Sequence, residues 1–233
     1  MPIFGGFTVR SWLARLRARV STTPTLGSAE AYSLWAASYP PEAHNSFMRL
    51  EESAVRQLLP DLGARRVLDA ACGTGRYAQL AHGRGASRVV GADSSLAMLR
   101  RAAGFARARA DLTALPFAAA AFDVVICGLA LGHLSPGQMP RAIAELARVL
   151  DGRGTVVLSD FHPYLYRAGR RRTFTASSGA RFNVEHHPHL VADYFRALTA
   201  AGLDVTGLIE APGTVHGRDL PAVLVIAARP RRS

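Results

Sequence analysis

The run from Val67 to Ala78 constrains the fold more than any other part of the sequence. An apolar segment ends at Asp69, a glycine-containing turn follows it, and helical sequence begins near Arg76. Gly73 and Gly75 let the backbone approach a ligand because they have no Cβ, and the first N–H groups of a helix have no partner within the helix. The run therefore predicts a strand, a ligand-binding turn and a helix.

Beyond this run, apolar strand patterns alternate with helical patterns, which is typical of a parallel sheet covered by helices on both faces. We predict strands over Arg66–Ala71, Arg88–Asp93, Ala106–Ala110, Phe122–Gly128 and Gly154–Asp160, with two closing strands near Asp204–Ala211 and Ala222–Ala228. The predicted helices between them are Arg76–Arg84, Leu96–Gly104, Gln138–Leu150 and Leu190–Ala201. This pattern predicts a Rossmann-like α/β domain with a seven-stranded, mostly parallel sheet.

The N-terminal part of the chain reads as helical. Residues 1–27 are interpreted as a basic amphipathic helix over Thr8–Val20 followed by a linker, and the role of that helix stays open between membrane-surface anchor and ordinary packing. Two further helices, from near Ser28 to Tyr39 and over Ser46–Leu59, form a helical cap on the domain, which we place at residues 28–233.

Composition sets bounds on the class of protein. The 233 residues are 49% hydrophobic and 19% charged, as in one packed globular domain. The net charge of +11 allows a nucleic-acid partner, but the basic residues are mostly arginine in an Ala- and Gly-rich chain, so we do not expect one. Two cysteines form no disulfide framework, and we find no signal peptide and no apolar run of about 18 to 20 residues. We expect a cytoplasmic protein, monomeric or homodimeric.

The glycine turn alone does not identify its ligand. Gly73, Gly75 and Ala78 also satisfy a dinucleotide-binding pattern, with an acidic residue, Asp93, at the expected distance beyond them. Asp69 argues against that ligand, because a carboxylate just before the turn would repel a pyrophosphate and attract a cation.

Several motifs in order make the sequence resemble the class I S-adenosylmethionine (SAM)-dependent methyltransferases, in particular those of ubiquinone, menaquinone and biotin biosynthesis. The resemblance covers about residues 32–158 and rests on DAACGTG, GADSS, RADLTALPFAAAAFDVVICGLALGHL and LARVLDGRGTVVLSDF. Ala71 departs from the pattern, since the family commonly has glycine there. The resemblance implies SAM as cofactor, S-adenosylhomocysteine (SAH) as product, and a small-molecule acceptor.

The resemblance also implies which residues bind the cofactor. Asp93 would accept hydrogen bonds from the ribose hydroxyls, Asp111 and the Leu112 N–H would face the adenine, and Cys127, Gly128 and Leu129 would line the floor under the methionine part. Tyr32 and Tyr39 would close over the cofactor from the N-terminal helix. The complete predicted cofactor set is Tyr32, Tyr39, Asp69, Ala71, Gly73, Gly75, Asp93, Ser94, Met98, Asp111, Leu112, Gly128 and Leu129.

The segment from Phe161 to His189 is dense in aromatic, arginine and histidine residues and is the predicted acceptor side. The alternation around Ser177–Gly179 predicts a β-hairpin that forms a lid over the active site. The run Arg167, Arg170, Arg171 and Arg172 would suit a carboxylate-bearing metabolite, or it forms a solvated basic surface. We predict no metal site, because the histidine spacing matches no zinc or iron motif.

Methyl transfer to a protonated acceptor requires a group that takes up a proton. His162, which follows the fifth strand, is the first candidate, His133 is the second and His186 is the third. The leading hypothesis is methylation of an O or C atom of a small aromatic or quinone-like metabolite. The alternatives are an RNA or protein methyltransferase and a non-catalytic SAM-binding protein.

Overall fold

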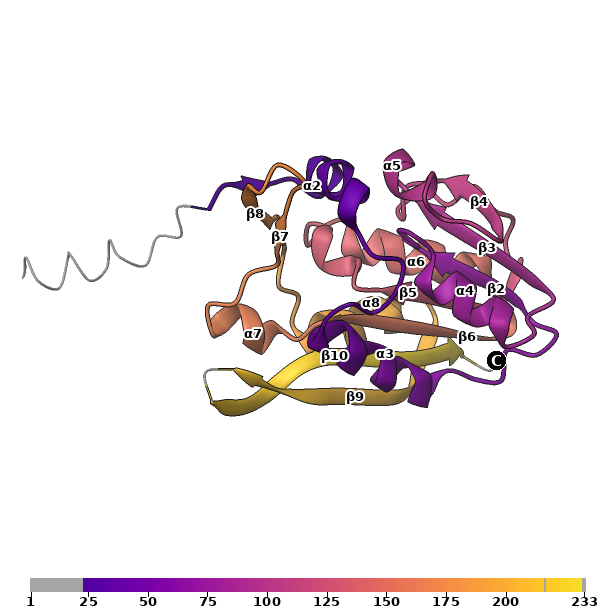
Figure 1. Ribbon diagram of the computed structural model, residues 1–233. Helices are drawn as coiled ribbons and strands as arrows, with labels where there is room; N and C mark the ends of the chain where they lie inside the picture. The colour runs from indigo at the N-terminus through magenta and orange to yellow at the C-terminus, as the bar shows by residue number, and fades with distance from the viewer. Residues whose placement is uncertain (1–22, 216, 232–233) are drawn as a thin grey trace, which may run out of the picture.

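Seven strands form one sheet in the computed structural model of the chain, which describes residues 23–215 and 217–231 (Figure 1). Their order across the sheet is β4 (Ala106–Arg109), β3 (Arg88–Asp93), β2 (Arg66–Ala70), β5 (Phe122–Gly128), β6 (Leu150–Phe161), β10 (Arg218–Pro230) and β9 (Leu203–Val215). The first five strands are parallel, and β10 runs antiparallel to both of its neighbours. The predicted seven-stranded, mostly parallel sheet is therefore confirmed, while the predicted helix at Thr8–Val20 lies outside the described residues.

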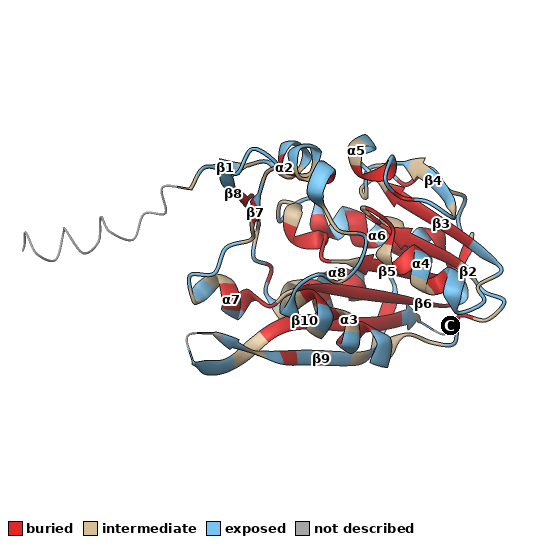
Figure 2. Cartoon of the chain, viewed as in Figure 1, coloured by how far each residue is buried: buried red, intermediate tan, exposed pale blue. Residues whose placement is uncertain are grey.

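Helices cover both faces of this sheet, which explains why its central strands are almost continuously apolar. Val67 of β2 packs with α3 (Ser46–Leu58) and α4 (Arg76–Gly83) in one buried cluster. The next residue, Leu68, points to the opposite face and packs with α6 (Met139–Val149) and α8 (Val191–Ala200). Figure 2 shows the result as a buried centre of strands between exposed helix surfaces.

The covering helices follow from their sequence patterns. The buried side chains of α6 recur at helical spacing, namely Met139, Ala142, Ile143, Leu146 and Val149. Helix α3 begins where the Asn45 side chain accepts a hydrogen bond from the Met48 N–H at 2.8 Å. Within the described residues, no helix is both long and apolar enough to cross a bilayer.

A second, smaller sheet holds the predicted hairpin. Strands β7 (Thr173–Thr175) and β8 (Arg181–Val184) pair antiparallel, as predicted, and β1 (Thr25–Leu26) adds to β8 in parallel. The prediction of a linker through residue 27 missed β1, because a strand of two residues carries no periodic pattern. Figure 1 shows this sheet beside α2 (Ser28–Trp35), away from the large sheet, and α2 continues into the 3-10 helix η1 (Ala36–Ser38).

Four elements differ from their predicted bounds by more than two residues. Helix α5 is a single turn, Leu96–Leu99, and Arg107 on β4 donates to the Leu99 carbonyl at 2.7 Å at its end. Strand β6 already begins at Leu150. The closing strands β9 and β10 are longer than predicted because they pair with each other over Arg218–Pro230 of β10, whereas β6 pairs with β10 only over Val223–Ala228. A short helix, α7 (Pro163–Arg167), follows β6.

Candidate active site

A cavity of about 370 Å³ opens at the carboxyl ends of β2, β3 and β5. Strand order reverses direction between β2 and β5, and ligands of open α/β sheets bind at such a point. The large sheet supplies one side of the cavity. Helix α2, the 3-10 helix η2 (Leu131–His133) and the residue before β7 supply the opposite side. The predicted nucleotide turn and the predicted lid therefore face one space.

The turn after β2 needs left-handed backbone at alternate residues. Ala71 has a φ of 60°, Gly73 a φ of 54° and Gly75 a φ of 92°. A Cβ at Gly75 would lie 2.2 Å from the Phe105 ring, so this glycine is required by packing, and it does not line the cavity. A Cβ at Gly73 would meet no protein atom within 4 Å, so protein packing leaves open space there. The positive φ of Ala71 gives the physical reason for the glycine that the resembled family commonly has.

Asp69 has a structural role and also faces the cavity. Its Oδ2 accepts the Ala78 N–H at 2.8 Å, which ties the start of α4 to the end of β2. Its carboxyl is buried and lines the cavity. Burial raises the pKa of Asp69 to about 7, although the hydrogen bond from Ala78 opposes the shift. The carboxyl group therefore changes charge near neutral pH.

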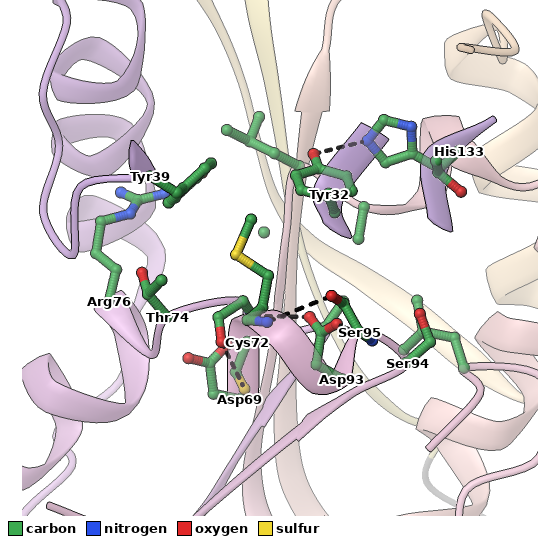
Figure 3. Close-up of a pocket in the computed structure, with 18 of the residues that line it drawn as sticks. Tyr32, Tyr39, Asp69, Cys72, Thr74, Arg76, Asp93, Ser94, Ser95 and His133 are labelled. Carbon is green, nitrogen blue, oxygen red and sulfur yellow. Dashed lines mark hydrogen bonds between the residues drawn. The ribbon is translucent and has the colours of Figure 1, made fainter. Parts of the chain in front are cut away.

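Asp93 ends β3 and orders the turn beside it. Its two oxygens accept the Gly73 N–H at 2.8 Å and the Ser95 N–H at 2.7 Å. Burial raises the pKa of Asp93 above its usual value. Each carboxylate oxygen has a second lone pair, so both can still accept a hydrogen bond from a ligand. Figure 3 shows Asp93 beside Cys72, Ser94 and Ser95 on the sheet side of the cavity.

The opposite wall carries a hydrogen-bonded group made of Tyr32, His133 and Arg172. The Nη1 of Arg172 donates to His133 Nε2 at 2.6 Å, and the Tyr32 hydroxyl lies 3.0 Å from the same nitrogen, as Figure 3 shows for Tyr32. His133 Nδ1 is 2.9 Å from the Glu185 carbonyl oxygen, which can only accept, so Nδ1 carries the proton. Burial and the nearby Arg172 charge hold the pKa of His133 well below its ordinary value. This imidazole is neutral at pH 7 and has its lone pair on Nε2, toward the cavity.

The other two candidate histidines do not line the cavity. His162 caps α7: its Nδ1 accepts the Tyr164 N–H at 3.2 Å and its Nε2 donates to Glu210 at 2.8 Å, so both nitrogens are engaged elsewhere. His186 packs behind His133, with ring centroids 6.1 Å apart, and within the described part of the chain its buried Nδ1 has no hydrogen-bond partner. Burial lowers the pKa of His186. The geometry thus brings only His133 of the three to the cavity.

The structure brings the predicted cofactor residues together with one exception, Gly75. Those that line the cavity are Tyr32, Tyr39, Asp69, Ala71, Gly73, Asp93, Ser94, Met98, Asp111, Leu112, Gly128 and Leu129. Cys127 is buried in the core behind Gly128, so the floor consists of Gly128, Leu129 and Ala130. Asp111 also accepts the Thr113 N–H at 2.8 Å.

Glu51 is a buried carboxylate behind the cavity that was not predicted from the sequence. Glu51 of α3 is 0% exposed and accepts hydrogen bonds from Arg76 Nη2 at 2.7 Å, from the Tyr77 hydroxyl at 2.7 Å, and from the Ser159 hydroxyl. Arg76 and Tyr77 in turn line the cavity. The available signal was a charged residue on the core-facing side of an amphipathic helix, at helical spacing from Met48 and Val55.

Comparisons with known proteins agree with this geometry. The family model described as "Methyltransferase domain" matches residues 67–154, from β2 to the start of the apolar part of β6. A ubiquinone/menaquinone biosynthesis C-methyltransferase of Syntrophotalea carbinolica is 31% identical over 182 residues, which are 71% of this chain and 75% of that protein. A malonyl-acyl-carrier-protein O-methyltransferase of Pseudescherichia vulneris is 34% identical over 125 residues, 51% of this chain and 49% of that protein.

Several curated relatives match over only part of their length, and the chain spans about half of each. Among solved structures, an S-adenosylmethionine dependent methyltransferase from Mesorhizobium loti superposes with a TM-score of 0.64 at 27% identity, over 77% of this chain and 97% of that chain. The chain therefore belongs to the class I SAM-dependent methyltransferases, with SAM as its cofactor.

Proposed function

We propose that this protein transfers the methyl group of SAM to an O or C atom of a small aromatic or quinone-like metabolite. One observation supports the proposal most: the cavity has acidic groups on its sheet side and, on the opposite wall, His133 and Arg172, which are hydrogen-bonded to each other and are not among the predicted cofactor residues. The first side fits the cofactor, and the second offers polar groups to an acceptor.

The residues on the sheet side fit SAM. The open space over Gly73 admits a ligand against the backbone. Asp93 would hold the ribose hydroxyls, Asp111 and Leu112 would flank the adenine, and the ionised form of Asp69 would favour the cationic methionine part. When bound, SAM supplies an electrophilic methyl group on a sulfonium.

The proposed acceptor class is based on the names of two relatives and on the aromatic side chains at the cavity. One relative is named as a quinone C-methyltransferase and another as an O-methyltransferase, which is why both O and C remain in the proposal. The aromatic side chains of Tyr32 and Tyr39 line the cavity with ring centroids 6.3 Å apart, and outside the lining Trp35 stacks on Tyr32 with ring centroids 6.0 Å apart. Such walls suit a planar acceptor.

We propose His133 as the proton acceptor. In the structure the Nε2 lone pair of its neutral imidazole accepts the Arg172 N–H at 2.6 Å. When that hydrogen bond breaks, the same lone pair could take up a proton from the acceptor, directly or through the Tyr32 hydroxyl at 3.0 Å. His162 was the first candidate from sequence, but its two engaged nitrogens and its position outside the cavity support a structural role as the cap of α7. The chain's own contribution is then alignment of the acceptor, exclusion of water and removal of one proton.

The test is methyl transfer from radiolabelled SAM to a panel of quinols, phenols and aromatic acids by the purified chain. Label incorporated into one class of acceptor, and lost in Asp93→Ala, supports the proposal. Incorporation into transfer RNA or protein in place of small molecules would contradict it. SAH binding without transfer to any member of a broad metabolite extract would support a non-catalytic SAM-binding protein instead.

A further inference from the structure

Arg172, in the acceptor half of the cavity, is a cation without an anionic partner among the residues that the structure describes. The structure describes residues 23–215 and 217–231, and in that part no Asp or Glu oxygen lies within 4.0 Å of its guanidinium. Arg76, another arginine that lines the cavity, is paired with both Glu51 and Glu52. A partly buried charge is costly unless a counter-charge or strong hydrogen bonds compensate it.

The position of Arg172 is fixed by neutral contacts of its backbone, its Nη1 atom and the faces of its guanidinium. Its carbonyl accepts the Val184 N–H at 2.8 Å, which anchors the residue to β8. Nη1 donates to the Leu129 carbonyl at 2.7 Å as well as to His133. Its guanidinium carbon lies 5.2 Å from the centroid of the Phe161 ring and 5.6 Å from that of Tyr32. The guanidinium is therefore held in place before any ligand binds.

One edge of this guanidinium remains available. Both protein hydrogen bonds use Nη1, and within the described residues Nε and Nη2 have no protein acceptor. Neither of these nitrogens is among the buried unpaired atoms, so both are accessible. The N–H bonds of Nε and Nη2 point the same way along one planar edge, and this edge matches the two oxygens of a carboxylate.

The charges of the cavity support the same assignment. Asp69 and Asp93 lie on the sheet side, where the cofactor residues gather, and Arg172 lies on the opposite wall. The Arg172 charge lowers the pKa of His133 and opposes the rise in the pKa of Tyr32 and Tyr39, so it acts on the whole of this wall. A cationic cofactor and an anionic acceptor would each meet a complementary side.

We propose that Arg172 binds a carboxylate of the acceptor through its Nε and Nη2 edge, so that the substrate is a carboxylate-bearing small molecule. The proposal rests on the proposed function and narrows its acceptor class.

The experiment is calorimetric titration of the SAH-saturated protein with benzoate and with its neutral analogue benzamide. Wild type should bind benzoate at least tenfold more tightly than benzamide. Arg172→Gln should abolish that preference and leave SAH affinity within about threefold of wild type, while Arg172→Lys should keep the preference at reduced affinity. Arg167→Gln is the matched control, because Arg167 is exposed on α7 and does not line the cavity.

Three results would overturn the proposal. Equal affinity for the two probes, or no benzoate binding to wild type, would show that the cavity does not select a carboxylate. A tenfold loss of SAH affinity in Arg172→Gln, with the benzoate preference retained, would assign Arg172 to the cofactor's own carboxylate. If wild type binds no SAH at all, the proposed function is contradicted, and this inference is contradicted with it. The SAH titration by itself distinguishes that case from a failure of the Arg172 proposal alone.

Discussion

Replacing Glu51 with alanine should lower the stability of the protein by about 3 to 5 kcal/mol, since it breaks a buried ion pair and leaves the partner charge behind. The Glu51 side chain is 0% exposed, and Arg76 is only 13% exposed. Removing the carboxylate leaves Arg76 with Glu52, at 3.2 Å, as its remaining acidic partner, and it leaves the buried Tyr77 and Ser159 hydroxyls without their acceptor. This loss would be a large part of the total of about 5 to 15 kcal/mol that a folded protein has.

Urea unfolding followed by circular dichroism measures this change, and thermal unfolding should show a Tm lower by roughly 6 to 20 °C. Arg56→Ala is the control, because Arg56 forms an exposed pair with Glu52 and should cost less than about 1 kcal/mol. The double variant Glu51→Met, Arg76→Met should be more stable than Glu51→Ala, since it removes both buried charges. A loss below about 1 kcal/mol in Glu51→Ala, or a double variant that is less stable than the single one, would refute the reasoning.

Three further predictions concern the cavity. Asp93→Ala should weaken SAH binding about 10- to 100-fold, because hydrogen bonds to a charged acceptor are lost, whereas Asp93→Asn should weaken it less. The measurement is calorimetry, and unchanged SAH affinity in Asp93→Ala would place the ribose elsewhere. Because burial raises the pKa of Asp69 to about 7, this carboxyl is protonated below that pH and anionic above it, so the affinity for cationic SAM relative to SAH should rise between about pH 6 and pH 8. The rise should disappear in Asp69→Asn. His133→Asn should lower kcat about 10²- to 10⁴-fold with little change in SAM affinity. Because the pKa of His133 is lowered, the fall of the wild-type rate on the acid side of its pH profile should lie below pH 6.5. A fall at or above that pH, or a larger loss of kcat in His162→Asn, would contradict the assignment of His133 as proton acceptor.

Elements with strong local patterns could be predicted from the sequence, and those held by distant contacts could not. Strands β3 and β5 match their predicted bounds, because long apolar runs between turn residues are unambiguous. Helix α5 and strand β1 differ from prediction, and both make contacts with distant parts of the chain: Arg107 binds the last carbonyl of α5, and β1 pairs with β8. Neither contact leaves a periodic trace in the sequence.

The residues of the candidate site also fall into two groups, those that local motifs predict and those whose roles depend on distant contacts. Residues of the nucleotide turn and strand ends follow from motifs, because their spacing along the chain determines where they lie. His133 and His162 hold equivalent places after β5 and β6, so position alone could not rank them as proton acceptors. The ranking depends on Glu210, which engages His162 from β9, and on Arg172, which brings charge to His133 from the hairpin. Both contacts link residues 39 or more positions apart.

The central claim, that this cavity is the site of a SAM-dependent reaction, is tested most directly by calorimetric titration of the wild-type protein with SAH and, separately, with NAD. The glycine turn alone would admit either ligand, and the acidic residues Asp69 and Asp93 on the sheet side distinguish them. One SAH should bind per chain with a Kd in the micromolar range, roughly −8 kcal/mol, and NAD should show no measurable binding. Binding of NAD more tightly than SAH would contradict it.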